Sequence, residues 1–249
     1  MSATRQAFST RVDEIVDGIF RISTPVPPSV VPGGFTFNQY LIRDDAPLLF
    51  HTGPRMLFAA VSEAVERVIP LATLRYVSFS HVEADECGSL NQFLAAAPQA
   101  VPLCGQIAAM VSIGDLADRP PRALADQERL SIGRHTVQWI DAPHLPHGWE
   151  CGFLSETTTR TLLCGDLFTQ FGETHPALTE SDILEPSEAA RIGTMDYYAH
   201  SPDTGRLLER LASTAPTTLA CMHGSAWRGD GAALLRSLAS RLDPATTAH

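Results

Sequence analysis

The stretch SHVEADECGSL, residues 80–90, places four ionisable side chains between two apolar segments. These side chains are His81, Glu83, Asp85 and Glu86, and apolar residues stand on both sides of them. Burying such groups without partners costs solvation energy. The stretch is therefore either a solvated acidic turn or part of a binding site, and the rest of the chain has to decide between the two.

The composition is that of an ordinary globular protein with an acidic surface. The 249 residues are 44% hydrophobic and 18% charged, and the net charge of −10 argues against nucleic acid and anionic membranes as partners. The first 18 residues lack the apolar core of a signal peptide, and no run approaches the roughly 20 apolar residues of a membrane span. The five scattered cysteines fit reduced thiols. We therefore expect a cytoplasmic protein without a membrane segment.

Strands and helices alternate along the chain, which favours an α/β domain. The expected strands cover residues 15–24, 35–42, 47–53, 74–80, 100–105, 135–144, 159–166 and 217–224. The expected helices cover residues 54–70, 88–98, 106–114, 187–200, 203–213 and 229–242. Residues 116–133 and 170–188 read as irregular connections. Because no long polar linker interrupts the pattern, we expect a single domain over residues 1–249.

Four of the expected strands end near a side chain that can bind a metal, namely His81, His147, Asp166 and His223. Strand ends of α/β sheets are where loops converge to build sites. In an extended chain, residues 81, 83 and 85 would also point to one side. Three imidazoles and at least three carboxylates exceed the needs of one tetrahedral zinc ion and suit two metals with a bridging carboxylate. Such an oxygen-rich set favours iron or manganese.

Residues 80–90 are similar to the first metal motif of the metallo-β-lactamase superfamily. Glu83 replaces the second histidine of that motif, as in flavodiiron proteins and related oxygen-binding diiron proteins. NQYLI (38–42), PHLPHGW (143–149), LLCGDLF (162–168), MDYYAHSP (195–202) and MHGSAWR (222–228) resemble further segments of that family in the same order, the fourth resembling a Tyr-rich helix. The resemblance implies an αββα sandwich with a non-haem diiron centre that binds, and as an oxidoreductase reduces, O₂, NO or peroxide.

The resemblance also implies a role for each matching residue. By position, His81, Glu83 and His147 would hold one iron, Asp85 and His223 the other, and Asp166 would lie between them. The family has histidine where this chain has Glu86, which either binds the second iron as a carboxylate or leaves that place to water.

The other histidines that we considered are not predicted to be metal ligands. His144 is expected to be a loop residue that could orient a carboxylate, not a ligand. His51 stands where many members of the superfamily have Asp, which puts a structural hydrogen bond in doubt. His135, His175 and His200 are expected at the surface.

Three functional readings stay open at this point. The 249 residues include no flavodoxin-like or rubredoxin-like segment, so diiron chemistry would take electrons from a separate flavodoxin, rubredoxin or reductase. A homodimer, as formed by the relatives, is also open. The first alternative is a metal-dependent hydrolase that uses zinc, manganese or iron. The second is a non-catalytic oxygen sensor, in which gas binding shifts a conformational equilibrium.

Overall fold

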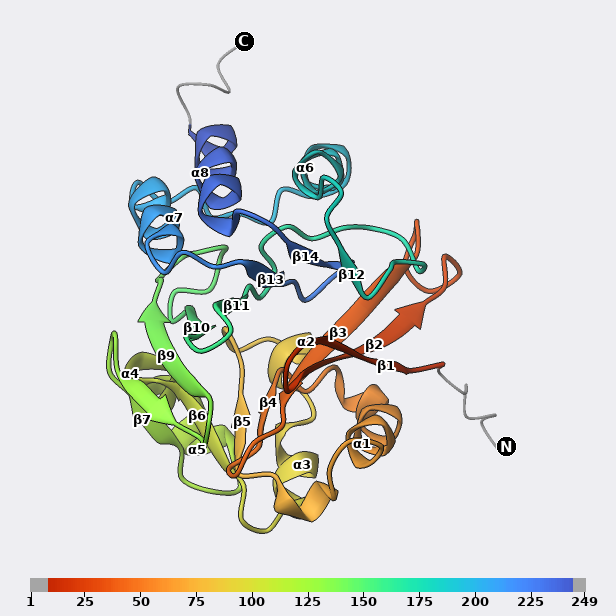
Figure 1. Ribbon diagram of the computed structural model, residues 1–249, viewed down its shortest axis with the longest axis vertical. Helices are drawn as coiled ribbons and strands as arrows, with labels where there is room; N and C mark the ends of the chain where they lie inside the picture. Colours follow the sequence, from red (N-terminus) through yellow and green to blue (C-terminus); the bar gives the residue numbers. More distant parts are fainter. Residues whose placement is uncertain (1–8, 244–249) are drawn as a thin grey trace.

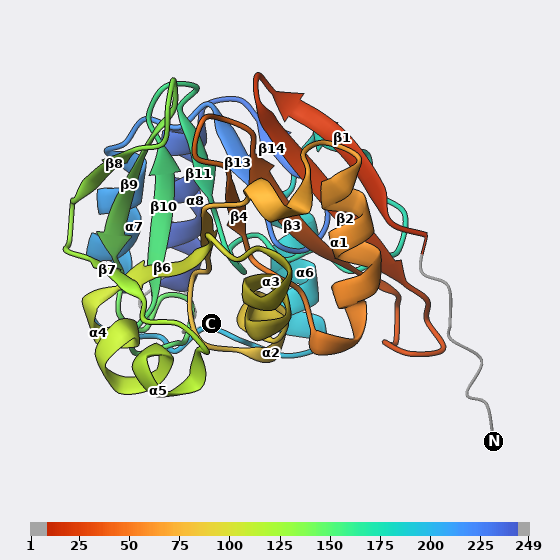
Figure 2. The same ribbon diagram turned by 90° about the horizontal axis from the view of Figure 1, so that it is seen from below.

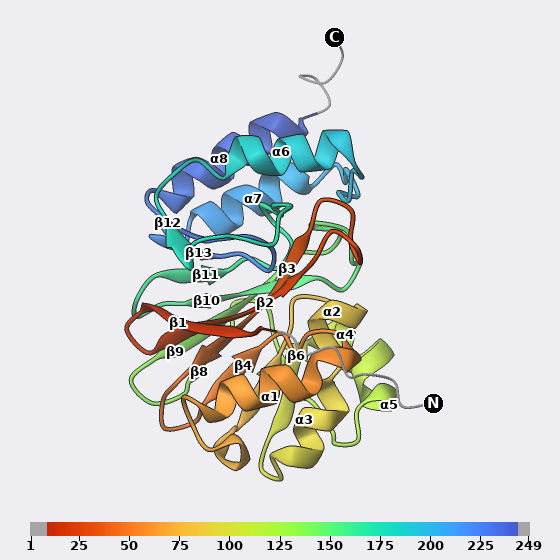
Figure 3. The same ribbon diagram turned by 90° about the vertical axis from the view of Figure 1, so that its right-hand side faces the viewer.

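The computed structural model describes residues 9–243 and has two sheets packed between two layers of helices (Figure 1 and Figure 3). This arrangement confirms the predicted αββα sandwich. The prediction that the chain has no signal peptide concerns residues 1–18, of which residues 1–8 lie outside the described part.

The first sheet contains seven strands in chain order. The first four strands pair antiparallel, and β4 to β7 pair parallel. The strands of this sheet are β1 (Arg11–Val16), β2 (Ile19–Val26), β3 (Phe35–Ile42), β4 (Leu48–Phe50), β5 (Tyr76–Ser78), β6 (Val101–Gly105) and β7 (Arg122–Leu124).

The second sheet also has seven strands, in the order β12-β14-β13-β11-β10-β9-β8. Its strands are β8 (Arg129–Ser131), β9 (Thr136–Asp141), β10 (Gly152–Glu156), β11 (Thr161–Leu163), β12 (Leu178–Thr179), β13 (Thr218–Ala220) and β14 (Ala226–Arg228). The prediction that residues 116–133 form an irregular connection is wrong in part, because β7 and β8 lie within it. Short edge strands of three residues carry too little periodicity to be recognised in a sequence.

Helices of the first half of the chain cover the first sheet. They are α1 (Phe58–Glu66), α2 (Ala84–Cys87), α3 (Leu90–Ala96), α4 (Gln106–Ala108) and α5 (Gly114–Leu116), with the 3₁₀ turns η1 (Arg55–Leu57) and η2 (Leu71–Thr73) and the π-helical turn η3 (Ala109–Ile113). Figure 2 shows α1 and α3 against this sheet and α4 and α5 near β6 and β7. Helices α6 (Leu184–Gly193), α7 (Thr204–Ala212) and α8 (Gly231–Leu242) cover the second sheet (Figure 3).

Three clusters of buried apolar side chains fill the spaces between the four layers. One packs α1 and α3 against the first sheet through Val61, Val65 and Phe93. A second lies between the sheets, where Phe50 and Trp139 are among its members. The third packs α7 and α8 against the second sheet. The central strands of each sheet are therefore buried on both faces, and the loops that meet at the carboxyl ends of the strands are where a site can form.

The helix predicted over residues 187–200 extends less far than expected. Helix α6 ends at Gly193, and the following residues, including Tyr197 and Tyr198, are irregular. Glycine there weakens the helix by lacking a side chain to restrict the backbone. No helix within residues 9–243 is long and apolar enough to cross a membrane.

Candidate metal centre

The candidate site lies where the loops after β5, β9, β11 and β13 meet. Strands β9, β11 and β13 run in one direction, because β10 pairs antiparallel with β9 and β11, and β11 pairs parallel with β13. Their carboxyl ends therefore lie at one edge of the second sheet. The loop after β5 reaches this edge from the first sheet, since Nε2 of His81 lies 3.0 Å from Nε2 of His147.

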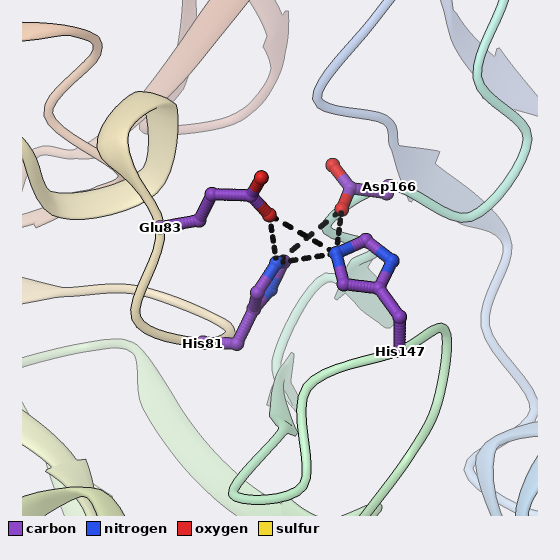
Figure 4. Close-up of side chains that lie close together, drawn as sticks. All are labelled: His81, Glu83, His147 and Asp166. Carbon is purple, nitrogen blue, oxygen red and sulfur yellow. Dashed lines mark hydrogen bonds and ion pairs between the residues drawn. The ribbon is translucent and has the colours of Figure 1, made fainter. Parts of the chain in front are cut away.

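One group of potential ligand atoms belongs to His81, Glu83 and His147 (Figure 4). Nε2 of His81 is 3.0 Å from Nε2 of His147, and Oε2 of Glu83 is 3.0 Å from both nitrogens. Two ligands at right angles around an ion, with bonds of about 2.1 Å, lie about 3 Å apart. The three atoms therefore have separations that suit the ligands of one metal ion.

Asp166 lies between this group and a second pair, Asp85 and His223. Its Oδ2 is 3.5 Å from Nε2 of His81 and 3.6 Å from Nε2 of His147. Its Oδ1 is 3.3 Å from Nε2 of His223, and Oδ2 of Asp85 is 3.6 Å from that same nitrogen. One carboxylate thus faces two separate groups of potential ligand atoms, with a different oxygen toward each.

Hydrogen bonds to backbone carbonyls fix the rings of His147 and His223. Nδ1 of His147 donates to the carbonyl oxygen of Tyr197 at 2.8 Å, and Nδ1 of His223 donates to that of Thr36 at 2.8 Å. Because a carbonyl oxygen only accepts, Nδ1 carries a proton in both rings, and a neutral ring then offers its lone pair at Nε2. Hydrogen bonds of this kind orient metal-binding histidines in proteins.

The ring of His81 is fixed by a chain of three side chains. Nδ1 of His81 is 3.0 Å from Oγ of Ser80, which is 3.1 Å from Nε2 of His51, and Nδ1 of His51 is 2.9 Å from Sδ of Met222. A thioether has no proton to donate, so Nδ1 of His51 is the donor and its Nε2 accepts from the Ser80 hydroxyl. Burial lowers the pKa of His51 to about 3, in agreement with a neutral ring. The hydroxyl oxygen can then accept from Nδ1 of His81, which leaves Nε2 of His81 facing the cluster.

Ser80 and the two carbonyl groups were not identified from the sequence. A backbone carbonyl gives no signal in a sequence, and only the fold brings His51 beside Ser80. Two glycines permit the close packing that this requires. A Cβ atom at Gly165, where φ is 50°, would lie 2.9 Å from Oγ of Ser80, and one at Gly148 would lie 2.9 Å from Cβ of His81.

The backbone of the motif departs from the extended chain that we predicted. Glu83 is extended (φ −140°, ψ 165°), but residues Ala84–Cys87 form helix α2. The backbone N–H of Cys87 donates to the carbonyl oxygen of Glu83, which closes the helical turn. Residues 81, 83 and 85 therefore do not project from one side of a strand. Instead, the turn directs Glu83 toward His81 and buries Glu86 completely.

The remaining histidines lie outside the cluster. His144 is exposed in a loop with φ of 66° and is not one of the described residues whose potential ligand atoms gather in the cluster. His200 is exposed, and His175 is half-buried. The prediction that His135 lies at the surface is wrong, because only 2% of it is exposed and Nδ1 lies 3.3 Å from Glu156.

The charges within the cluster depend on one another. Hydrogen bonds with His147 and His81 lower the pKa of Glu83 to about 2. Burial opposes the charged forms of Asp166 and His223, but their interaction with each other helps to lower the pKa of Asp166 and raise the pKa of His223. Protons on the imidazoles therefore balance the carboxylates when no cation is bound. A metal ion and these protons compete for the same atoms.

A cavity of about 470 Å³ opens onto the cluster. Besides Glu83, Asp85, His147, Asp166 and His223, it is lined mainly by apolar side chains, which include Val31, Pro32, Phe35, Phe171, Met195 and Tyr197. The rings of Phe35 and His223 stack with a centroid distance of 4.2 Å. Apolar walls of this kind limit the water that reaches a reactive centre.

Comparisons with known proteins give a consistent family. The sequence model of the ODP family beta lactamase matches residues 35–224. Rubredoxin-oxygen oxidoreductase of Megalodesulfovibrio gigas is 26% identical over 209 residues, which cover 80% of this chain and 50% of that protein. The anaerobic nitric oxide reductase flavorubredoxin of Aeromonas hydrophila subsp. hydrophila is 28% identical over 210 residues, which cover 79% of this chain and 41% of that protein.

A solved structure supports the same fold. Rubredoxin oxygen:oxidoreductase from Desulfovibrio gigas superposes with a TM-score of 0.79 at 22% identity, over 92% of this chain and 62% of that one. This chain spans about half the length of the curated relatives it matches. The family match runs from β3 to the loop after β13 and contains all six residues of the two ligand groups. The protein has the metallo-β-lactamase fold, and the chain belongs to the ODP family beta lactamases.

Proposed function

We propose that this chain is a non-haem diiron protein that binds and reduces O₂, NO or peroxide with electrons from an external donor. The observation that carries the proposal is the orientation of three imidazoles, whose Nδ1 atoms are fixed while every Nε2 faces a carboxylate. The residues that would hold the ions are His81, Glu83 and His147 for one, Asp85 and His223 for the other, and Asp166 between them.

The donor atoms suit a pair of iron ions. A ligand set of carboxylates and imidazoles favours iron or manganese, whereas zinc prefers sites rich in nitrogen and sulfur. Oδ1 of Asp166 is buried without a hydrogen-bond partner. Its charged neighbour there is Nε2 of His223 at 3.3 Å, and a bound metal would take the place of a proton on that nitrogen.

The protein's own groups would serve binding, orientation and the exclusion of water. A bound iron pair supplies the electrons for reducing a small oxidant. Asp166 would set the separation of the two ions, because each of its oxygens faces a different ligand group. Ser80 and the carbonyl groups of Tyr197 and Thr36 hold the imidazoles in place. The apolar cavity gives a small gas molecule access to the cluster while limiting water.

The electron donor is part of the same proposal. The names of two relatives refer to rubredoxin with oxygen and to flavorubredoxin with nitric oxide. We infer a flavodoxin, a rubredoxin or a reductase as the donor to this chain. Free thiols at all five cysteines support the cytoplasm as its compartment. A homodimer is also proposed, and light scattering of the purified protein would measure it.

The test begins with protein loaded with Fe(II) under anaerobic conditions. Elemental analysis should give two irons per chain. Reduced rubredoxin should then support steady consumption of O₂ or NO in a gas-electrode assay, and the metal-free protein should show none. Two zinc ions, hydrolysis of an ester or phosphodiester and no electron uptake would contradict the diiron proposal in favour of a hydrolase. Reversible gas binding without turnover would instead identify a sensor.

A further inference from the structure

Glu86 is a buried carboxylate beside the metal cluster that is not one of the six proposed ligands. Helix α2 turns it into the interior, where its relative exposure is 0%. Neither of its carboxylate oxygens has a hydrogen-bond partner. A buried carboxylate without a hydrogen bond is strongly destabilising unless a cation or a donor approaches it.

The position of Glu86 relates it to the metal cluster. Its Oε2 lies 4.0 Å from Nε2 of His81. Potential ligand atoms of Glu83, Asp85 and Glu86 all lie within 4.8 Å of one another. Two ligands on opposite sides of one ion, with bonds of about 2.1 Å, lie about 4.2 Å apart, so the limit of 4.8 Å places Glu86 at most about 0.6 Å beyond that separation from a proposed ligand of each ion.

Within the described residues, no arginine forms an ion pair with this carboxylate. Within residues 9–243, the ion pairs of Glu83, Asp85, Glu86 and Asp166 are all with histidines, whereas the arginines pair with other acidic residues. The chain contains no lysine at all. In this part of the chain the ion pair of Glu86 is with His81, whose Nε2 is also a proposed metal ligand, so a bound metal ion would replace the proton of His81 as the balancing charge.

We propose that Glu86 is a metal ligand, so that a fourth carboxylate completes the two-metal centre where the family motif has histidine. This inference rests on the proposed two-metal function and adds to it. Four carboxylates neutralise two divalent ions, whereas a histidine at this position would leave an excess positive charge on the centre. Because carboxylates favour hard ions, Glu86 should also shift the preference of the site toward iron and manganese and away from zinc.

The test compares metal binding by the wild type with that of Glu86→Gln and Glu86→His. Glutamine keeps the size and the hydrogen-bonding capacity of a protonated Glu86 but removes the charge. Glutamine should therefore weaken binding of one Mn(II) ion at least 100-fold in anaerobic calorimetry. Substitution of residues that only hydrogen-bond to metal ligands already lowers metal affinity about 10- to 100-fold. The electron paramagnetic resonance spectrum should change from a coupled pair to a single Mn(II). Histidine should restore the second ion and increase the relative affinity for Zn(II).

A matched control separates ligand loss from general destabilisation. Glu156 is also 0% exposed, but donors from Thr158 and Thr159 occupy its oxygens. Glu156→Gln should lower the melting temperature and still bind two ions with wild-type affinity. If Glu86→Gln also binds two ions as the wild type does, Glu86 is a neutral buried acid and the inference is wrong. If the wild type itself does not bind two ions, the proposed function fails instead.

Discussion

Asp166→Asn tests the bridge between the two ligand groups. Asparagine has the size and shape of aspartate, so the substitution leaves no cavity and changes mainly the charge. The two carboxylate oxygens of Asp166 face different groups, at 3.5 Å from Nε2 of His81 and 3.3 Å from Nε2 of His223. Removing the charge should therefore weaken both metal sites together, whereas a change in a terminal ligand should weaken one.

The expected size of the effect follows from this geometry. A neutral amide in place of a shared carboxylate should cost each ion at least about 100-fold in affinity, because outer-shell changes alone cost about 10- to 100-fold. At about 1.4 kcal/mol for each factor of ten, this amounts to roughly 2.8 kcal/mol for each ion. In the metal-free protein, the imidazoles lose a buried partner. The free energy of unfolding of the metal-free protein should therefore fall, by at most about 3–5 kcal/mol. The loss is limited because the imidazoles can release their protons and so avoid an unpaired buried charge.

The assay is elemental analysis of protein that has been loaded with Fe(II) and desalted, together with urea unfolding of the metal-free form. We expect two irons per wild-type chain and fewer than one per Asp166→Asn chain. Asp126→Asn is the control, because Asp126 forms an exposed ion pair with Arg210 at 2.7 Å, and such pairs contribute about 0–1 kcal/mol. Retention of two irons at wild-type affinity by Asp166→Asn would refute the bridging role.

Three further predictions concern hydrogen bonding, pH and packing. Ser80→Ala should remove the acceptor for Nδ1 of His81 and weaken Mn(II) binding about 10- to 100-fold in calorimetry. Burial opposes the ionisation of Glu156, but hydrogen bonds from Thr159 and Thr158 lower its pKa. Its ionised form therefore stabilises the fold above the ordinary glutamate pKa, and this stabilisation is lost as the pH falls through the lowered value. Glu156→Gln should accordingly reduce the free energy of unfolding by about 1.5–3 kcal/mol at pH 7 in urea titrations, and by less in acid. Phe153→Ala, at a position with 0% exposure, should reduce the same free energy by about 3–5 kcal/mol.

Each of these predictions has its own control. Ser62→Ala alters a half-buried serine of α1 and should leave Mn(II) binding unchanged, so equal loss in both serine variants would count against the role of Ser80. An effect of Glu156→Gln that does not depend on pH would show that the charge of Glu156 contributes nothing. A Phe153→Ala protein with wild-type stability would mean that the third apolar cluster does not depend on this ring.

The sequence indicated the fold, and it named six side chains that the structure brings together; their role as ligands stays a prediction. The alternation of strands and helices indicated an α/β domain, and the resemblance to the metallo-β-lactamase superfamily specified the αββα sandwich. His81, His147, Asp166 and His223 each follow a strand, and the ends of strands with a common direction meet at one sheet edge. The positions of these residues after the strands therefore already indicated which side chains could lie close together.

The sequence was not sufficient for local conformation within the site. Periodicity suggested an extended motif, but a helical turn from Ala84 to Cys87 directs Asp85 toward His223 and buries Glu86. A stretch of four residues is too short for periodicity to distinguish strand from helix. The turn is also held from outside the motif, because the backbone N–H of Thr52 donates to the carbonyl oxygen of Glu86 at 2.8 Å.

What the sequence determined by itself is the α/β class and the chemical types of the groups at the sheet edge, because both follow from side-chain patterns along a single chain. Only the tertiary structure decided which atoms of those groups face one another. The ring of His81 is oriented by Ser80 and His51, and the ring of His223 by the carbonyl oxygen of Thr36, which is 187 residues away in the chain. Hydrogen-bond direction depends on distances of a few ångströms between segments that are remote in sequence, and no pattern along the chain encodes such distances.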